Sequence, residues 1–514
     1  MKKYIGLTIG PIYKTLQDAR KTRELWAGSY FFSYIMKLII EGFKHRPFIT
    51  PYVDENDPDF LGMLKGIMPV GVFHDRIIFE AQDNDYDKLS DTIEKILSDV
   101  SKEIAEHIRE DGTNVSSYLN KYLQLYFCEL DYDGDTPHSV INKDMNRHLD
   151  SLELQESFVP CEERGYFAEF LRRANNSFLI EKAFGRRSER FKSLPEIAVS
   201  ELNLNKLNPE KYRDIFESYD DKEEQLKEGY DLYEDIKEKY RKQKVQLSQY
   251  HKYIAIVHAD GDSLGKTIES ITDNGQFKEF SRKLFTFALE AHEAIKTFGG
   301  ETIFAGGDDL LFFAPVVNQG KSIFELLDDI DILFRGQFKE LKKGPTISFG
   351  VSISYYKFPL YEALETSREM LKKAKKAEAN KDKKNAVAFR VLKHSGQYFE
   401  AVYMKGSLEH CYLMEFIRNI RPSDNISRLM TSLTHNIFRQ NSVLGCIGGS
   451  PRKLESFFEN NFNEAIHKIP ENRNQINAIM KLIEAVYSSY NYQDDDERSR
   501  TVYSILRLNK FMRE

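Results

Sequence analysis

The sequence predicts an α+β protein in which two ferredoxin-like units are separated by an insert domain and followed by a helical C-terminal domain. Two observations support this. The expected order of elements is β-α-β-β-α near the N-terminus and β-α-β-β-α-β in the second half. The chain has 514 residues, too many for one hydrophobic core, since cores stop growing near about 250–300 residues. We therefore expect four domains, at residues 1–110, 111–250, 251–395 and 396–514.

The first unit begins with a short apolar run at residues 4–12, which is typical of a strand, and continues with apolar side chains at helical spacing over residues 15–43. Residues 48–53 and 76–81 have the composition of strands, and residues 86–108 are again helical in pattern. The order predicts a ferredoxin-like unit.

The insert, from residue 111 to residue 250, is expected to be mostly helical. Its strongly charged stretch at residues 220–244 predicts a solvated helix. In the second unit we expect, in order, strand 253–257, helix 277–298, a hairpin of 301–304 and 310–314, helix 322–341 and strand 346–354. A bundle is expected after residue 395, with helices at 409–420, 427–439, 454–469 and 474–489.

The composition narrows the class of protein. Four scattered cysteines without a C-x-x-C pair indicate a reducing, cytoplasmic setting and no disulfide framework. No apolar stretch approaches the roughly 20 residues of a membrane helix, so we expect a soluble protein without membrane contact. The net charge of −7 excludes a global basic field, so contacts with nucleic acid would be local, for example at Arg186, Arg187, Arg190 and Lys192, or made through partner subunits.

Two short motifs in the second unit carry the chemistry. Asp260 stands at the end of an expected strand, and Gly306-Gly307-Asp308-Asp309 forms an expected tight hairpin turn. Because that strand and the hairpin are neighbours in a β-α-β-β unit, the three carboxylates can converge on two divalent ions about 3.5–4 Å apart, Mg²⁺ or Mn²⁺. The glycines would let backbone approach a nucleotide. A turn without further function is the alternative for the Gly-Gly-Asp-Asp stretch alone, since Gly and Asp dominate such turns.

A helix after the last strand of the second unit carries several lysines. Lys375 shares a register with Ala363, Leu364, Leu371 and Ala374, so it is our candidate for reaching back to a triphosphate. A solvated basic face is the alternative for this lysine and the better explanation for its neighbours.

These motifs resemble the large Palm-polymerase subunit of type III CRISPR effector complexes, in the Cmr (III-B) branch. The Gly-Gly-Asp-Asp turn and the segment 259–266 resemble its cyclase site, and a similar hairpin occurs in diguanylate cyclases. The segment 19–30, with Gly10-Pro11 before it, is similar to the opening of that branch, and residues 193–196 add weaker support. The resemblance spans about residues 4–395.

The resemblance implies a function. In that family, binding of target RNA to the complex switches on synthesis of an ATP-derived second messenger, usually cyclic oligoadenylate. It implies ATP as substrate, Mg²⁺ or Mn²⁺ as cofactor, and Cmr-type subunits, guide RNA and target RNA as partners. It also implies metal binding by Asp260, Asp308, Asp309 and the Gly261 carbonyl. The nucleotide-binding residues that we expect are Gly28, Ser29, Gly261, Asp262, Ser263, Gly306, Gly307 and Lys375.

The sequence departs from the family pattern in two ways. Many relatives begin with an HD nuclease domain, whereas this sequence starts at the first expected strand and its only His-Asp pair is His74-Asp75. We therefore predict no DNase activity. The insert often carries a cysteine zinc knuckle, but here Cys128 and Cys161 are far apart, so we predict no structural zinc.

Three other functions remain open at this point. A non-catalytic scaffold would have no use for mutually repelling carboxylates at all three positions. A GTP-using diguanylate cyclase is disfavoured by the opening segment, the two-unit layout and the absence of Glu-Phe after Gly-Gly-Asp. An enzyme that joins AMP to another small molecule, such as S-adenosylmethionine, would use the same metal chemistry, so these motifs do not separate it from a cyclase.

Overall fold

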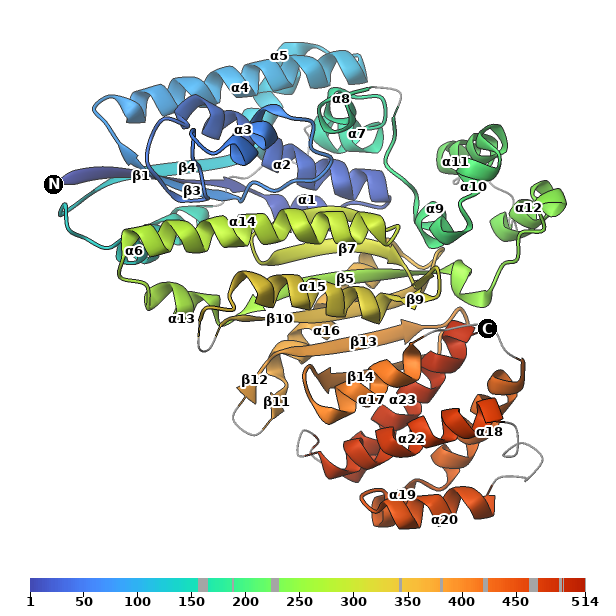
Figure 1. Cartoon of the computed structure of the whole chain (residues 1–514). Coiled ribbons are helices and arrows are strands. Elements are labelled where there is room, and N and C mark those ends of the chain that lie inside the picture. The colour runs from blue at the N-terminus through green and yellow to red at the C-terminus, as the bar shows by residue number, and fades with distance from the viewer. Residues whose placement is uncertain are drawn as a thin grey trace.

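The computed structural model contains two large β-sheets, each packed against helices, and a helical region at the C-terminal end of the chain (Figure 1). The predicted α+β class with two ferredoxin-like Palm units is confirmed. The structure describes residues 1–155, 165–186, 189–222, 231–341, 344–379, 382–418, 424–461, 470–489, 492 and 494–513.

The first sheet has four antiparallel strands in the order β2-β3-β1-β4, the order of a ferredoxin-like unit. They are β1 (Lys2–Gly10), β2 (Phe48–Thr50), β3 (Arg76–Ala81) and β4 (Gln124–Tyr132). The fourth strand comes from beyond residue 110, a range expected to be mostly helical. It pairs with β1 along its whole length, so the sheet continues into the stretch predicted as insert.

Helices cover both faces of this sheet, because alternate side chains of β1 point to opposite sides. Ile5, Leu7 and Ile9 pack toward α2 (Thr22–Phe43) and α4 (Asp85–Ile108). On the other face Tyr4 packs with α6 (His138–Glu153). The remaining helices of this part are α1 (Ile12–Gln17), α3 (Pro58–Lys65) and α5 (Gly112–Tyr122).

The predicted continuous helix over residues 15–43 is wrong in its first turns. The chain is extended at Lys21, between α1 and α2. The Glu24 carboxylate accepts a hydrogen bond from the Arg20 amide at 2.8 Å, which holds the entry to α2. The long helix therefore begins only at Thr22.

The insert has two parts with different packing. Its helices are α7 (Tyr166–Arg172), α8 (Phe178–Phe184), α9 (Leu194–Ala198), α10 (Leu204–Leu207), α11 (Pro209–Lys222) and α12 (Leu232–Lys239). The first two pack on α2, whereas α11 and α12 enclose a small core of their own. Tyr233 and Tyr240 are fully buried there, so the prediction of a solvated helix is wrong for this part of 220–244. Residues 223–230 lie outside the described residues.

The second sheet has six strands in the order β14-β13-β10-β5-β7-β6. They are β5 (Tyr253–Asp262), β6 (Glu301–Gly306), β7 (Asp309–Pro315), β10 (Thr346–Tyr355), β13 (Ala386–Leu392) and β14 (Tyr398–Met404). Its last four strands repeat the order of the first sheet. The neighbours are antiparallel except for β10 and β13, which are parallel.

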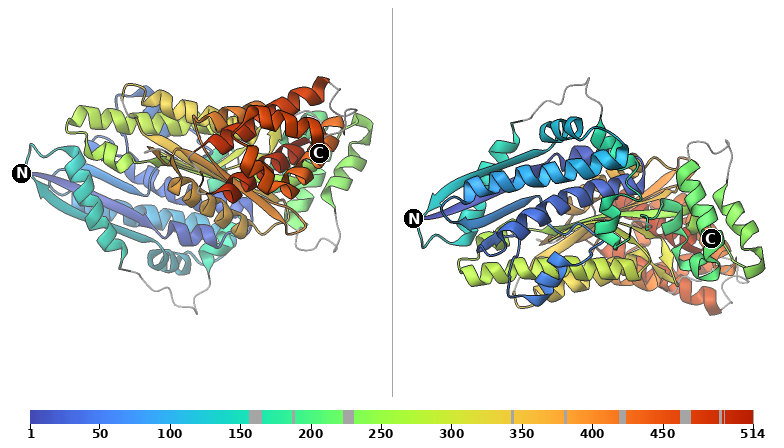
Figure 2. Two further views of the ribbon diagram at one scale, coloured as in Figure 1. Left: turned by 90° about the horizontal axis from the view of Figure 1, so that it is seen from below. Right: turned by 90° about the horizontal axis from the view of Figure 1, so that it is seen from above.

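Three long helices accompany this sheet. They are α14 (Asn274–Thr297) and α15 (Ile323–Gln337), which pack together, and α16 (Leu360–Lys376), which lies along β10, β13 and β5. Shorter elements are α13 (Leu264–Glu269), β8 (Val317–Asn318), β9 (Lys321–Ser322), β11 (Glu378–Ala379) and β12 (Asp382–Lys383). The first Palm unit lies beside α14 and β6, as the views of Figure 2 also show.

The C-terminal region packs back on the second sheet. It contains α17 (Leu408–Ile417), α18 (Asp424–Arg439), α19 (Asn441–Ile447), α20 (Pro451–Asn461), α22 (Pro470–Ser488) and α23 (Asp495–Arg513). The sequence did not predict α23. Its Phe511 ring meets the Tyr253 ring edge to face at 4.7 Å, which joins the chain's end to the start of β5.

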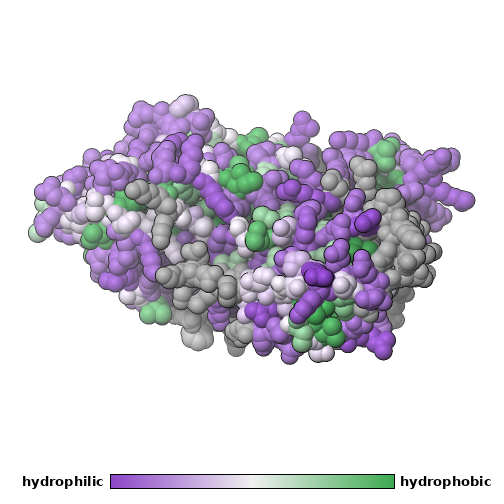
Figure 3. Space-filling model, turned by 60° about the horizontal axis from the view of Figure 1, so that its bottom comes forward, coloured by the Kyte–Doolittle hydropathy of each residue, from purple (hydrophilic) through white to green (hydrophobic). Residues whose placement is uncertain are grey.

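The surface is dominated by polar groups. On the face shown in Figure 3, hydrophobic side chains are scattered among hydrophilic ones. Within the described ranges, no helix is both long enough and apolar enough to span a bilayer.

Candidate metal and nucleotide site

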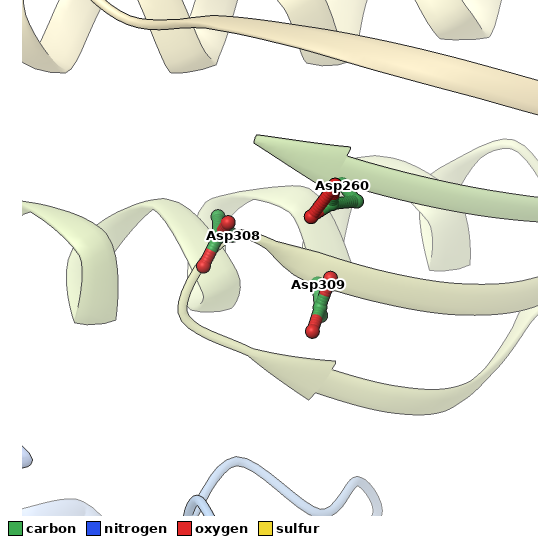
Figure 4. Close-up of side chains that lie close together, drawn as sticks. All are labelled: Asp260, Asp308 and Asp309. Atoms are coloured by element: carbon green, nitrogen blue, oxygen red, sulfur yellow. The ribbon is translucent and has the colours of Figure 1, made fainter. Parts of the chain in front are cut away.

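Three aspartates converge at one end of the neighbouring strands β5 and β7 of the second sheet (Figure 4). Asp260 lies near the end of β5, Asp308 lies in the turn between β6 and β7, and Asp309 is the first residue of β7. Because β5 and β7 are antiparallel neighbours, with Ala259 opposite Leu310, the register brings Asp260 beside the turn. One carboxylate oxygen from each lies within 4.8 Å of the other two. Within the described chain, no other group of three acidic, His or Cys side chains converges in this way.

The three carboxylates repel one another because their oxygens lie so close together. Desolvation and the nearby charge of Asp260 raise the pKa of Asp308 to about 6. The pKa of Asp309 is raised well above its ordinary value by desolvation and by the charges of Asp308 and Asp260. A cation placed among these oxygens would relieve this repulsion.

Lys375 is the positive group of the site. Its ammonium donates a hydrogen bond to the Gly261 carbonyl at 2.6 Å, forms an ion pair with Asp260, and lies 3.1 Å from Asp262 Oδ1. The lysine side chain is only 17% exposed. The structure thus brings Lys375 to the aspartates, as its register on the helix predicted.

Asp262 has an internal position. It is 3% exposed, and its carboxylate accepts hydrogen bonds from Thr346 Oγ1 at 2.8 Å, from Ser348 Oγ at 2.8 Å and from the Asn385 amide at 2.9 Å. With these donors and Lys375, both carboxylate oxygens of Asp262 have partners within the protein. Asp262 therefore holds the lysine ammonium next to the ends of β5 and β10, and a nucleotide contact at this residue stays a prediction. The sequence carried no signal for this role, because its partners come from distant strands.

The glycines of the motifs permit close packing. A Cβ on Gly261 would lie 2.7 Å from Asp308 Oδ2, the atom that accepts the hydrogen bond of the Gly261 amide at 3.2 Å. Gly307 has a φ of 65°, which favours glycine. Gly306 is buried against the Phe304 ring, and Ser263, exposed at the start of α13, also has positive φ.

The structure places the two predicted residues of the first unit inside α2. Gly28 is buried, and a Cβ there would lie 3.3 Å from Thr15 Cγ2, so this glycine lets α1 pack closely on α2. Ser29 is 4% exposed. A nucleotide contact at these two residues stays a prediction.

Two of the four residues of the predicted basic cluster in the insert form ion pairs within the chain. Arg190 pairs with buried Glu196 at 2.8 Å, and Lys192 pairs with Glu301 of β6 at 2.6 Å. Arg186 is exposed, and Arg187 lies outside the described residues, as does Cys161. The first pair lies within the insert and the second joins the insert to the second Palm unit, so Arg190 and Lys192 make contacts other than the predicted ones with nucleic acid.

One residue near the site was not predicted to belong there. His74, in the loop before β3, lies against the Gly307 turn, where a Cβ on Gly307 would approach its Cε1 to 2.7 Å. The sequence pointed only to the His74-Asp75 pair. The neighbourhood of His74 and Gly307 depends on how two units pack, which no local pattern encodes.

Fold and site together define a protein with two Palm-type units, of which the second carries a converging set of aspartates. Residues 4–110 match the family model described as CRISPR-associated protein Cmr2, N-terminal, and residues 253–388 match Cas10/Cmr2, second palm domain. The chain thus carries domains of the Cas10/Cmr2 family, and the predicted resemblance is confirmed.

Individual relatives agree with this assignment. The chain is 30% identical over 173 residues to the CRISPR system Cmr subunit Cmr2 of Pyrococcus furiosus, a match that spans 29% of this chain and 19% of that protein. Its fold is similar to a chain of the type III-B Cmr-beta structure in the apo state, with TM-score 0.60 and 13% identity over 99% of this chain and 81% of that chain. It is also similar to a chain of a Csm1-Csm4 cassette in complex with cA4, with TM-score 0.50 and 12% identity over 94% and 69%.

Proposed function

We propose that this chain is the nucleotidyltransferase subunit of an RNA-guided type III CRISPR complex, and that it makes cyclic oligoadenylate from ATP when the complex binds target RNA. The observation that carries the proposal is the convergence of Asp260, Asp308 and Asp309 beside Lys375. The similar Csm1-Csm4 cassette has been solved with cA4 and with AMPPNP, which supports a nucleotide ligand for this fold.

The residues fit a divalent metal. Mg²⁺ and Mn²⁺ prefer hard oxygen ligands, and the site offers three carboxylates and the Gly261 carbonyl, which already accepts a hydrogen bond from a cationic group. When bound, such ions activate an attacking 3′-hydroxyl and offset the charge of the triphosphate and leaving pyrophosphate.

The chain's own groups would then have separate tasks. Asp260, Asp308 and Asp309 supply negative oxygens from two adjoining strands. Lys375 pairs with Asp260 and would be free to meet the triphosphate once a cation neutralises that carboxylate. Asp262, which is held by hydrogen bonds from β10 and from Asn385, lies 3.1 Å from the same ammonium and keeps it near the site.

A non-catalytic scaffold accounts poorly for the same residues. Desolvation and the charge of Asp260 raise the pKa of both Asp308 and Asp309, so keeping these carboxyls ionised in the folded chain costs free energy. A scaffold would gain nothing in return for that cost. We also propose that the partners are other Cmr-type subunits with guide and target RNA, and that the complex works in the cytoplasm.

The test uses the chain assembled with its neighbouring subunits and guide RNA. Matched target RNA, Mg²⁺ and labelled ATP are added, with and without S-adenosylmethionine, and the products are identified by mass spectrometry. Cyclic oligoadenylate from the wild type and none from Asp308→Asn is the expected result. A product that forms only when S-adenosylmethionine is present would replace the cyclase proposal by AMP conjugation. If the intact complex makes no product, the non-catalytic scaffold function would stand instead.

A further inference from the structure

A loop of the first Palm unit lies against the acidic turn of the second. The loop, residues 66–75, joins α3 to β3, and it runs between α2 on one side and the β6–β7 hairpin on the other. Val70, Val72 and Phe73 of the loop are buried, so it is part of the core between the units. We call residues 66–75 the bridging loop.

The bridging loop is tied to α2 at three positions along the helix. Trp26 Nε1 donates a hydrogen bond to the Pro69 carbonyl at 2.8 Å, and Lys37 Nζ donates one to the Gly66 carbonyl at 3.2 Å. Between them, Ser33 Oγ accepts the amide hydrogen of Phe73 at 2.9 Å in a buried position. A buried hydrogen bond of this kind is costly to break without a replacement. The loop therefore moves with α2.

The same loop is tied to the acidic hairpin at two positions. The Ala305 amide donates a hydrogen bond to the Gly71 carbonyl at 3.1 Å, so the loop extends the edge of β6 for one residue. Two residues further along the hairpin, the His74 ring packs on Gly307, with no room for a Cβ on that glycine. Within the described part of the chain, the His74 ring makes no hydrogen bond, so its contribution is the packing itself.

This contact fixes the backbone next to the metal-binding oxygens. Gly307 directly precedes Asp308, and Asp308 Oδ2 in turn accepts the Gly261 amide hydrogen at 3.2 Å. A shift of the Gly307 peptide would turn the Asp308 side chain away from Asp260. The placement of the carboxylates is therefore sensitive to the position of His74, which comes from the other unit.

We propose that the bridging loop positions the acidic turn, with His74 as its positioning residue and Trp26 and Ser33 as its anchors on α2. The two Palm units are then coupled mechanically. A displacement of α2 relative to the second sheet changes the geometry of the metal site, and metal bound at the site resists that displacement. The proposal relies on the proposed function only in treating the three aspartates as a metal site.

The experiment compares full-length His74→Ala with the wild type by two measurements that need no enzymatic activity. Binding of Mn²⁺, followed by electron paramagnetic resonance, should weaken by about 10–100-fold, the range for residues that orient metal ligands. Hydrogen exchange should become faster in peptides covering 301–315 and stay unchanged in peptides covering 253–259. The matched control is His148→Ala, which removes an exposed histidine of α6 and should change neither measurement.

A second variant removes an anchor without emptying the core. Trp26→Phe keeps an aromatic ring beside Tyr30 and Phe191 but loses the donor to Pro69. It should speed exchange in the bridging loop and in the hairpin together. Unchanged Mn²⁺ affinity and hairpin exchange in His74→Ala, in a folded protein, would overturn the proposal. This test is independent of the proposed function. Even if the wild-type complex made no product, His74→Ala could still weaken Mn²⁺ binding and speed hydrogen exchange in the hairpin.

Discussion

Replacing Lys375 by methionine separates the two roles that we assign to this lysine. Methionine keeps much of the aliphatic stem and removes the ammonium. In the absence of metal, Asp262 then loses the one ion-pair partner that it has among the described residues, at a position where it is 3% exposed, and Asp260 loses its counter-charge. We expect the variant to be less stable without metal, to bind Mn²⁺ more tightly, and to make less product.

The size of the stability effect follows from the geometry. At the 3.1 Å between Lys375 Nζ and Asp262 Oδ1, two charges attract by about 5 kcal/mol at an effective dielectric constant near 20. Desolvation of the lysine opposes this gain, and removing one partner of a buried pair costs about 3–5 kcal/mol in practice. Asp262 keeps three neutral donors, so we expect about 3 kcal/mol. The gain in metal affinity should be at least about tenfold, which corresponds to about 1.4 kcal/mol of relieved competition for Asp260 and the Gly261 carbonyl.

Urea unfolding with and without saturating Mg²⁺ measures the first effect, and Mn²⁺ titration measures the second. Bound metal should narrow the stability difference between variant and wild type, because it neutralises the carboxylates in both. Lys372→Met, one turn away on α16 with a side chain 72% exposed, is the matched control and should stay within about 0.5 kcal/mol of wild type. A Lys375→Met protein with wild-type stability and wild-type metal affinity would refute the assigned contacts.

Three further predictions concern titration and coupling. Because the pKa of Asp308 is raised to about 6, protons compete with metal there, so Mn²⁺ affinity should fall as the pH is lowered through about 6, and this pH dependence should be weaker in Asp308→Asn. Burial lowers the pKa of His292 below its usual 6.5, so below that pH the unfolded chain binds more protons and stability falls. As the pH is lowered from 7 to 5.5, the wild type should therefore lose more stability than His292→Gln in urea unfolding. Trp26 is the chain's single tryptophan, and its hydrogen bond to the bridging loop should make its fluorescence respond to Mg²⁺ in the wild type but not in Asp308→Asn.

The acidic site could be predicted from sequence because its parts are local. Asp260 follows an apolar run of β5. Asp308 and Asp309 follow two glycines, and so few residues separate the apolar runs of β6 and β7 that only a tight hairpin turn can join them. The order of strands then places these two segments side by side. Lys375 was predictable for a similar reason, since the helical period fixes which face of α16 meets the sheet.

The parts that could not be predicted depend on long-range packing. The strand β4 is only half-buried along most of its length and follows directly on the polar helix α5, so its apolar signal is weak, and its identity as a strand comes from pairing with β1. The helix α23 has a strongly charged first turn, and the buried side chains Ile505 and Leu508 that mark it meet distant partners. Asp262 shows the same limit, because a carboxylate beside the acidic motif has the same sequence signal whether it faces a ligand or three internal donors.

The two Palm units differ most at one topologically equivalent connection, the link between their second and third strands. In the second unit that link is the tight turn of Gly307 and Asp308 between β6 and β7. In the first unit it is residues 51–75, which leave β2, form α3, and return to β3 through the bridging loop. The long link of one unit thus ends against the short link of the other, at His74 and Gly307. The tight turn contains a glycine and mutually repelling carboxylates, so its own side chains make few contacts that could fix its backbone. Here the packing contact comes from His74, in the corresponding segment of the neighbouring unit. Substitutions in the bridging loop should therefore act on the metal site although the first unit contributes none of its carboxylates.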